Sequence, residues 1–136
     1  MRTWRGVCWL VALLPVLGCK GARWDTPEAA YTTFAQAVLK GDAKVAYEGL
    51  SEATRKEIEA RSKEIAAASQ GSVRDDPVLL TFAVGSRPRL VTRVKRLKLE
   101  GAVATVAVTA GDETREQRLV DEGGRWKVDL TEILKK

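Results

Sequence analysis

Apolar residues recur at helical spacing in the first half of the chain and at alternate positions in the second half. The first helical repeat places four apolar side chains on one face: Tyr31, Phe34, Ala35 and Val38. Thr26 can cap this helix and Pro27 suits its first turn, while Gly41 follows its last turn. The pattern predicts a helix over residues 26–40.

Three further segments of the first half have helical signals. Asp42 can cap a short second helix and Ser51 a longer third one. The inner stripe of the third helix is only half apolar: Thr54, Ile58, Ser62, Ile65 and Ser69. Such a helix either lines a polar space or, as we expect, is a solvated helix covering the edge of a sheet. Residues 76–85 begin with Asp-Pro and end with Gly, which favours a short helix over a buried strand.

From Leu90 onward the hydrophobic period is two, and glycine-containing turns at 100–101, 111–112 and 122–124 divide the segment into four strands. The residues expected to face inward are Leu97, Leu99, Ala104, Val106, Val108, Trp126, Val128 and Leu130, while Arg125, Lys127 and Asp129 are expected on the wet face. The short connections predict an antiparallel meander. We therefore predict an α+β fold with N-terminal helices packed on a curved, antiparallel, four-stranded sheet.

The N-terminus has the pattern of a secretory signal. Arg2 and Arg5 precede an apolar stretch over residues 7–17, which is shorter than the roughly 20 residues that a stable membrane span needs. The predicted organisation is a removed signal peptide (1–18), a lipidated cysteine with a short tether (19–25) and one α+β domain (26–136).

The end of this stretch resembles the lipobox of bacterial lipoproteins: Val16, Leu17, Gly18 and Cys19. The resemblance implies a diacylglyceryl group on the Cys19 thiol, cleavage between Gly18 and Cys19, and acylation of the new amino group. Lys20 at the sorting position implies the outer membrane, where the organism has one. The alternatives are an ordinary secretory signal with a chance cysteine and an uncleaved anchor.

Composition excludes several chemistries. The chain has 136 residues, 45% of them hydrophobic, and a net charge of +5, which fits one ordinary globular domain. It contains no His, so Ser–His and Cys–His nucleophiles and His-ligated metals are excluded. Cys8 would leave with the signal and Cys19 would carry lipid, so no thiol remains for a disulfide or a metal. We expect no metal and no cofactor.

The mature chain resembles the nuclear-transport-factor-two-like superfamily, also called cystatin-like, in its opening and closing segments. These are Thr26 to Ala30, Phe34, Gly41, Asp42, Ala46, Tyr47 and Leu50, and then Ala104 to Val108 and Gly124 to Leu130. Small bacterial lipoproteins of this type are the nearest likeness. The resemblance covers nearly all of residues 26–132 and implies a sheet curled around the helices into a cone that admits a small molecule.

No residue of this chain matches a catalytic position of that superfamily's enzymes. Four aromatic residues are the candidates for lining the cone: Tyr31, Phe34, Tyr47 and Trp126. Asp75 and Asp76 could act as a base or bind a cation. We favour plain core packing for Tyr31 and Tyr47, and helix capping for Asp76.

Six cations lie within twelve residues: Arg87, Arg89, Arg93, Lys95, Arg96 and Lys98. They could form a patch for an anionic membrane, a polyanion or an acidic partner. We favour a solvated strand face whose charge is offset by Glu113, Glu116 and Asp121. Because no aromatic residues are interleaved with these cations, nucleic-acid binding is not expected.

Two classes of function remain after these exclusions. The first is a lipid-anchored domain on the extracytoplasmic side of the cell membrane that binds a protein partner or a small ligand without catalysis. The alternative is a cavity enzyme that uses Asp/Tyr acid–base chemistry on a small molecule. The absence of His and of a converging acid–base pair favours the first. Pairing of two chains through the sheet is left open.

Overall fold

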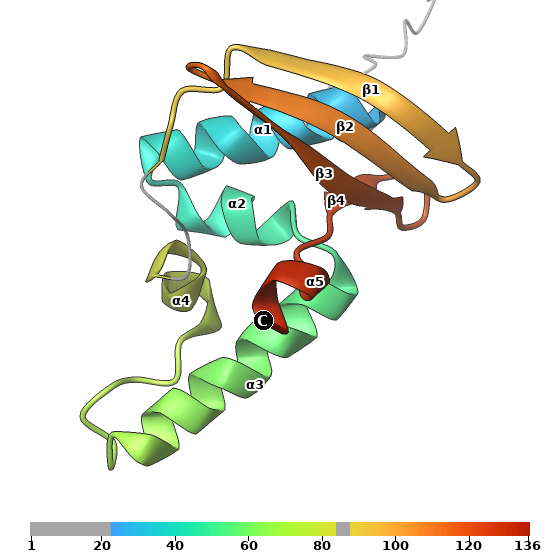
Figure 1. Ribbon diagram of the computed structural model, residues 1–136. Helices are drawn as coiled ribbons and strands as arrows, with labels where there is room; N and C mark the ends of the chain where they lie inside the picture. The colour runs from blue at the N-terminus through green and yellow to red at the C-terminus, as the bar shows by residue number, and fades with distance from the viewer. Residues whose placement is uncertain (1–22, 84–87) are drawn as a thin grey trace, which may run out of the picture.

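A computed structural model describes residues 23–83 and 88–136, and the predicted signal peptide, lipobox, Cys19, Gly85 and Arg87 lie outside these ranges. Five helices accompany the four strands in the described residues (Figure 1). The helices are α1 (Pro27–Lys40), α2 (Ala43–Glu48), α3 (Glu52–Ala68), α4 (Pro77–Ala83) and α5 (Thr131–Leu134). The strands are β1 (Arg93–Glu100), β2 (Val103–Ala110), β3 (Glu113–Asp121) and β4 (Trp126–Val128). The predicted α+β class is confirmed.

The strands form the predicted antiparallel meander, in the order β1-β2-β3-β4, and the sheet is open rather than closed. Gly101 and Gly111 take positive φ angles of 59° and 63° in the tight turns that join β1 to β2 and β2 to β3. Val106 pairs with Gln117 and Val108 with Arg115, so these side chains share one face of the sheet.

The predicted helix starts are also confirmed. The Thr26 hydroxyl accepts a hydrogen bond from the Ala29 backbone N–H at 3.1 Å, and Gly41 ends α1 in the left-handed region. The Asp42 carboxylate caps α2 and the Ser51 hydroxyl caps α3 in the same way. Each cap joins residues three positions apart, which is why a single sequence could predict it.

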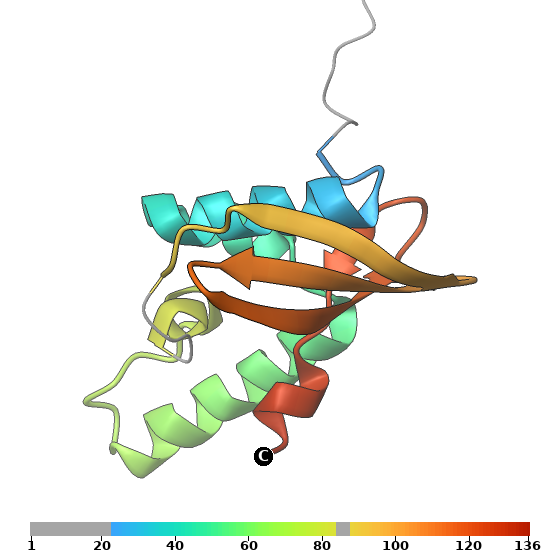
Figure 2. The same ribbon diagram turned by 45° about the horizontal axis from the view of Figure 1, so that its top comes forward.

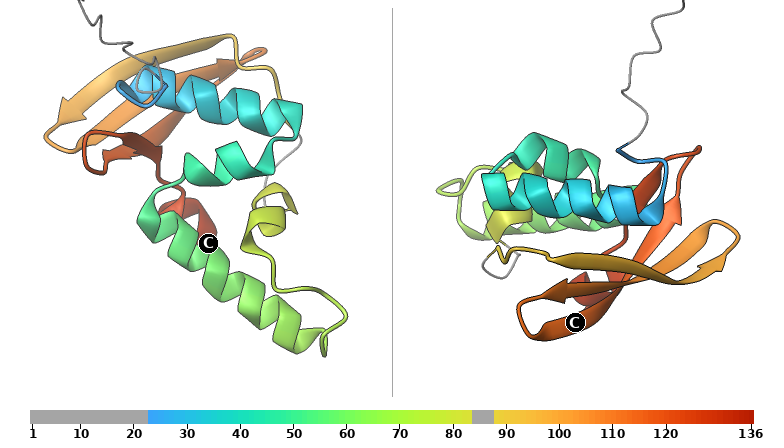
Figure 3. Two further views of the ribbon diagram at one scale, coloured as in Figure 1. Left: turned by 180° about the vertical axis from the view of Figure 1, so that it is seen from behind. Right: turned by 90° about the horizontal axis from the view of Figure 1, so that it is seen from above.

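The sheet packs on α1, and α2 lies beside α1 on the same side of the sheet, while α3 extends away from it toward α4 (Figures 2 and 3). The core cluster contains Trp24, Ala30, Tyr31, Leu50, Ile58, Ala104, Val106, Val108, Leu119, Trp126, Val128 and Leu134. All of these residues lie between Trp24 and Leu134, so residues 20–136 contain the whole of the described core.

The prediction that Lys127 lies on a wet face is wrong. Its side chain is only 8% exposed, and its ammonium donates to the Glu48 carbonyl and lies 4.9 Å from the centroid of a Trp24 ring. Burial lowers the pKa of Lys127, and the nearby charge of Arg125 lowers it further. The segment before α1 therefore covers the face of β4 that alternation assigned to solvent.

The expected burial of Leu97 and Leu99 is also wrong, because each is 50% exposed. The β1–β2 register shifts between Arg96 and Lys98, so Leu97 has no partner position on β2. The β1–β2 hairpin also extends past the N-terminal end of α1 (Figure 3), which leaves Leu99 uncovered although it pairs with Ala104.

The third helix packs differently from our expectation that it covers a sheet edge. Thr54, Ile58 and Ser62 are buried, but Ile65 is 41% exposed. The helix contacts α4 and α5, and α5 was not predicted. The half-apolar stripe thus reflects a helix that is covered at its N-terminal end and solvated at the other.

Candidate ligand pocket

A pocket of about 330 Å³ lies between α1, the inner face of β2 and β3, and the C-terminal helix α5. It is lined by Tyr31, Phe34, Ala35, Val38, Ile58, Thr81, Pro88, Arg89, Val91, Val108, Ala110, Glu113, Arg115, Gln117, Leu130, Ile133 and Leu134. This volume is at the lower end of the range of roughly 300–1,000 Å³ that is typical of small-molecule sites. The pocket therefore has room for a small ligand.

Most of the lining is apolar and comes from elements far apart in the chain. Phe34 and Val38 come from α1, Val108 from β2 and Leu134 from α5. The rings of Phe34 and Tyr31 are tilted by 53° with their centroids 6.0 Å apart, so they form one aromatic wall. Such a lining favours the burial of an apolar ligand surface.

One polar contact of the pocket joins Arg115 and Tyr31. Nη2 of Arg115 donates to the hydroxyl oxygen of Tyr31 at 3.1 Å. Tyr31 is 2% exposed, whereas Arg115 is exposed, so the pair runs from the aromatic wall toward solvent.

Two other charged residues of the lining pair with each other. Nη1 of Arg89 lies 2.6 Å from Oε2 of Glu113, and both side chains are largely exposed. Because Glu113 is bound to Arg89, this ion pair has no net charge and lies on the solvent side of the pocket.

Gln117 is a buried polar residue of the pocket wall, and its side chain bonds to the backbone. Its amide nitrogen donates to the carbonyls of Arg118 at 3.0 Å and Asp129 at 2.8 Å. Both amide hydrogens are thus used within the protein. Gln117 thereby ties β3 to the chain that leads into α5.

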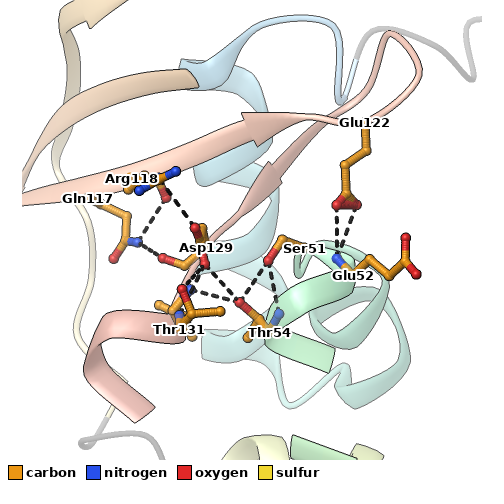
Figure 4. A network of polar contacts seen from close by, with 9 residues as sticks. Ser51, Glu52, Thr54, Gln117, Arg118, Glu122, Asp129 and Thr131 are labelled. Carbon is orange, nitrogen blue, oxygen red and sulfur yellow. Dashed lines mark hydrogen bonds and ion pairs between the residues drawn. The ribbon is translucent and has the colours of Figure 1, made fainter. Parts of the chain in front are cut away.

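A network of hydroxyls and a carboxylate fixes the two helices that flank the pocket (Figure 4). The Thr54 hydroxyl accepts from Ser51 Oγ and from the Leu130 backbone N–H, both at 2.8 Å, and donates to Asp129 Oδ1 at 3.3 Å. Asp129 Oδ1 also accepts from the backbone N–H and hydroxyl of Thr131, the first residue of α5.

A second contact of this region holds the start of α3. Both carboxylate oxygens of Glu122 accept from the backbone N–H of Glu52, at 2.9 and 3.2 Å (Figure 4). A negative charge is favourable at a helix N-terminus, so the turn before β4 anchors α3. Ile58 of α3 and Leu134 of α5 are thereby positioned at the pocket.

Two of the four residues expected to line the cavity do so. Tyr31 and Phe34 line the pocket, whereas Tyr47 and Trp126 do not. Trp126 begins β4, and its backbone N–H donates to the Trp24 carbonyl at 2.8 Å. Its side chain belongs to the core cluster.

Tyr47 faces α3 instead of the pocket. Its hydroxyl donates to Oε1 of Glu59 at 2.9 Å, and the guanidinium carbon of Arg55 lies 6.0 Å from its ring centroid. Burial, followed by the hydrogen bond to the Glu59 carboxylate, raises the pKa of Tyr47 to about 12.

The two aspartates considered as acid–base or cation sites lie outside the pocket lining. Asp76 caps α4, accepting from the Leu79 backbone N–H at 3.1 Å as expected. Asp75 accepts from the Ser62 hydroxyl at 2.5 Å and so ties the loop after α3 to that helix.

The cations from Arg89 to Lys98, here called the basic run, have other partners than those expected. Of Glu113, Glu116 and Asp121, only Glu113 forms an ion pair with the run among the described residues, through Arg89. Arg96 instead pairs with Glu28 of α1 at 3.0 Å, and Lys98 with Glu100 at 2.9 Å. The reason is topological, since β2 separates β1 from β3.

Arg115 and Gln117 are pocket residues that the sequence reasoning did not identify. A signal was present, because they alternate with Leu119 on the strand and period two places all three on one face. The residues predicted to face inward included none from this strand.

Residues 23–83 and 88–136 hold no group of three or more acidic, Cys or His side chains that could bind a metal ion. None of their helices combines the length and apolarity needed to cross a membrane.

No known family model, curated protein or solved structure matches this chain.

Proposed function

We propose that this protein is a lipid-anchored binding domain that holds a small, mostly apolar ligand in the pocket between α1, the sheet and α5, without catalysis. The pocket is the observation that carries the proposal. Its walls come from α1, β2, β3 and α5, and the network around Thr54 and Asp129 fixes the segments that close it. A pocket held by several rigid elements is typical of a preformed ligand site.

The arrangement of acidic groups supports binding over turnover. The carboxylate that lines the pocket, Glu113, is engaged by Arg89. Asp75 and Tyr47, two of the Asp and Tyr residues that the enzyme alternative could use, belong to contacts with α3. A general base must lie within hydrogen-bond reach of its substrate, and these two do not line the pocket.

The lipobox-like segment ending at Cys19 supports the membrane location. Two or three acyl chains on Cys19 would hold the domain stably, because each buried CH₂ contributes about 0.8 kcal/mol. Trp24 is already part of the core, so only a short stretch separates the anchor from the folded domain. The proposed place is the extracytoplasmic side of the membrane, on the outer membrane where one exists.

A neutral fluorescent dye, 1-aminoanthracene, tests pocket binding in residues 20–136. We expect saturable binding that Ala35→Leu weakens by about tenfold or more, because the larger side chain fills part of the pocket. Ala67→Leu on the exposed face of α3 is the matched control and should leave the affinity unchanged. Equal affinity in all three proteins, or no saturable binding, would contradict the proposal.

A further inference from the structure

The Arg115–Tyr31 pair has hydrogen-bonding capacity that the described residues do not use. The Tyr31 hydroxyl accepts from Arg115, which leaves its own hydrogen to be donated. In the described part of the chain, the Tyr31 hydroxyl makes no hydrogen bond as a donor. A guanidinium has five N–H donors, and one of them is used in this contact.

The charge of Arg115 is also unbalanced. No Asp or Glu of residues 23–83 or 88–136 forms an ion pair with it. The other two charged residues of the lining, Arg89 and Glu113, neutralise each other. The described lining therefore has one net positive charge, located at Arg115.

Two donors thus converge from one side of an otherwise apolar pocket. A neutral acceptor would satisfy the Tyr31 hydroxyl, but only an anion would also balance the Arg115 charge. The planar guanidinium matches a carboxylate, which can accept from both groups at once. The exposed position of Arg115 places such a head group toward solvent, with the apolar part of the ligand against Phe34 and Val38.

We propose that the ligand of this pocket is an amphipathic monocarboxylate, whose carboxylate binds Arg115 and the Tyr31 hydroxyl and whose hydrocarbon part fills the apolar lining. This inference rests on the proposed function, since it names the chemical class of the ligand for the same pocket. It adds a specificity role for Arg115 and Tyr31 that pocket binding alone does not require.

Competition between two probes of the same size tests the inference. Octanoate and octanamide have the same carbon chain and similar head groups but differ in charge at neutral pH. Each is used to displace 1-aminoanthracene from residues 20–136. We expect octanoate to bind about tenfold or more tightly than octanamide, because only octanoate carries a negative charge that balances the charge of Arg115.

Three variants assign the preference to its residues. Arg115→Met keeps an apolar stem and should remove the tenfold preference of octanoate over octanamide. Tyr31→Phe keeps the ring and should reduce the preference in part. Arg93→Met is the matched control, because Arg93 is an exposed arginine of β1 outside the lining, and it should keep the full preference.

The outcomes separate the two proposals. Equal displacement by octanoate and octanamide, or an unchanged preference in Arg115→Met, would overturn the carboxylate assignment and leave the pocket proposal standing. Failure of the unmodified domain to bind the dye would overturn the pocket proposal and the assignment with it.

Discussion

A single hydroxyl group, that of Thr54, connects three segments that meet beside the pocket. It accepts from Ser51 at the start of α3 and from Leu130 before α5, and it donates to Asp129 after β4. Thr54 is fully buried, so water cannot replace these bonds if the hydroxyl is removed. This residue is the point at which the loops around α5 are fixed.

Thr54→Val should therefore lower the free energy of unfolding by roughly 1–3 kcal/mol, because it leaves the partly buried Leu130 N–H without its acceptor. Thr32→Val on the exposed face of α1 is the control, and it should change stability by no more than about 0.5 kcal/mol. Urea unfolding of residues 20–136 measures both. Similar values for the two variants would show that the network contributes nothing to stability.

Contacts that join near neighbours in the sequence could be predicted at this scale, and contacts across the fold could not. The caps at Thr26 and Asp76 bond backbone groups three residues ahead, so the sequence alone indicates them. The bond between Arg115 and Tyr31 joins residues 84 positions apart. It exists only because β3 and α1 face each other across the core.

At the scale of elements, Tyr47 and Glu59 join α2 to α3 through one hydrogen bond. Burial and the neighbouring carboxylate hold the pKa of Tyr47 at about 12 in the folded protein, above its ordinary value of 10.0. The folded state therefore binds this proton more tightly than the unfolded state does. The stabilisation that the protonated Tyr47 hydroxyl gives to the folded state is fully present below pH 10 and is lost as the pH rises toward 12.

The free energy of unfolding should consequently fall more steeply with pH above 10 in the unmodified domain than in Tyr47→Phe. The lowered pKa of Lys127 has the opposite effect, but it is common to both proteins and cancels in the comparison. Glu59→Gln removes the neighbouring charge and should give an intermediate slope. Urea unfolding at several pH values provides the measurement, and parallel curves for all three proteins would contradict the assignment.

The elements with their own start and stop signals were predictable. Helices α1 to α4 and the strand order of the sheet follow from caps, turn glycines and periodicity. The four-residue helix α5 is too short to show a period, and the burial of Lys127 depends on Trp24, which lies outside any predicted element. Half of the expected cavity lining was wrong, because Tyr47 bonds to Glu59 of α3 and Trp126 lies on β4, outside the pocket lining.

At the scale of the whole molecule, only a short stretch of chain separates the proposed lipid anchor from the domain that contains the pocket. The backbone of Trp24 accepts from the N–H of Trp126, so the folded part begins within a few residues of Cys19. A ligand held by this domain would stay close to the bilayer. An amphipathic monocarboxylate is a ligand that membrane lipids can supply at that position.

Lipid attachment at Cys19 is tested by metabolic labelling of the full chain with a palmitate analogue in a bacterial host. We expect label in the unmodified protein and none in Cys19→Ala, because the thiol is the proposed site of attachment. Cys8→Ala is the matched control and should keep the label. Label that persists in Cys19→Ala would contradict the lipoprotein proposal without affecting the pocket.

The central claim is that the pocket between α1, the sheet and α5 binds a ligand, and methyl NMR of residues 20–136 during titration with octanoate tests it most directly. We predict saturable shifts of the methyl groups that line the pocket, with Val38, Val108 and Leu134 among them. Val120 and Ala107, which do not line it, should stay unchanged. Absence of saturable shifts, or shifts confined to methyls away from the lining, would contradict the account.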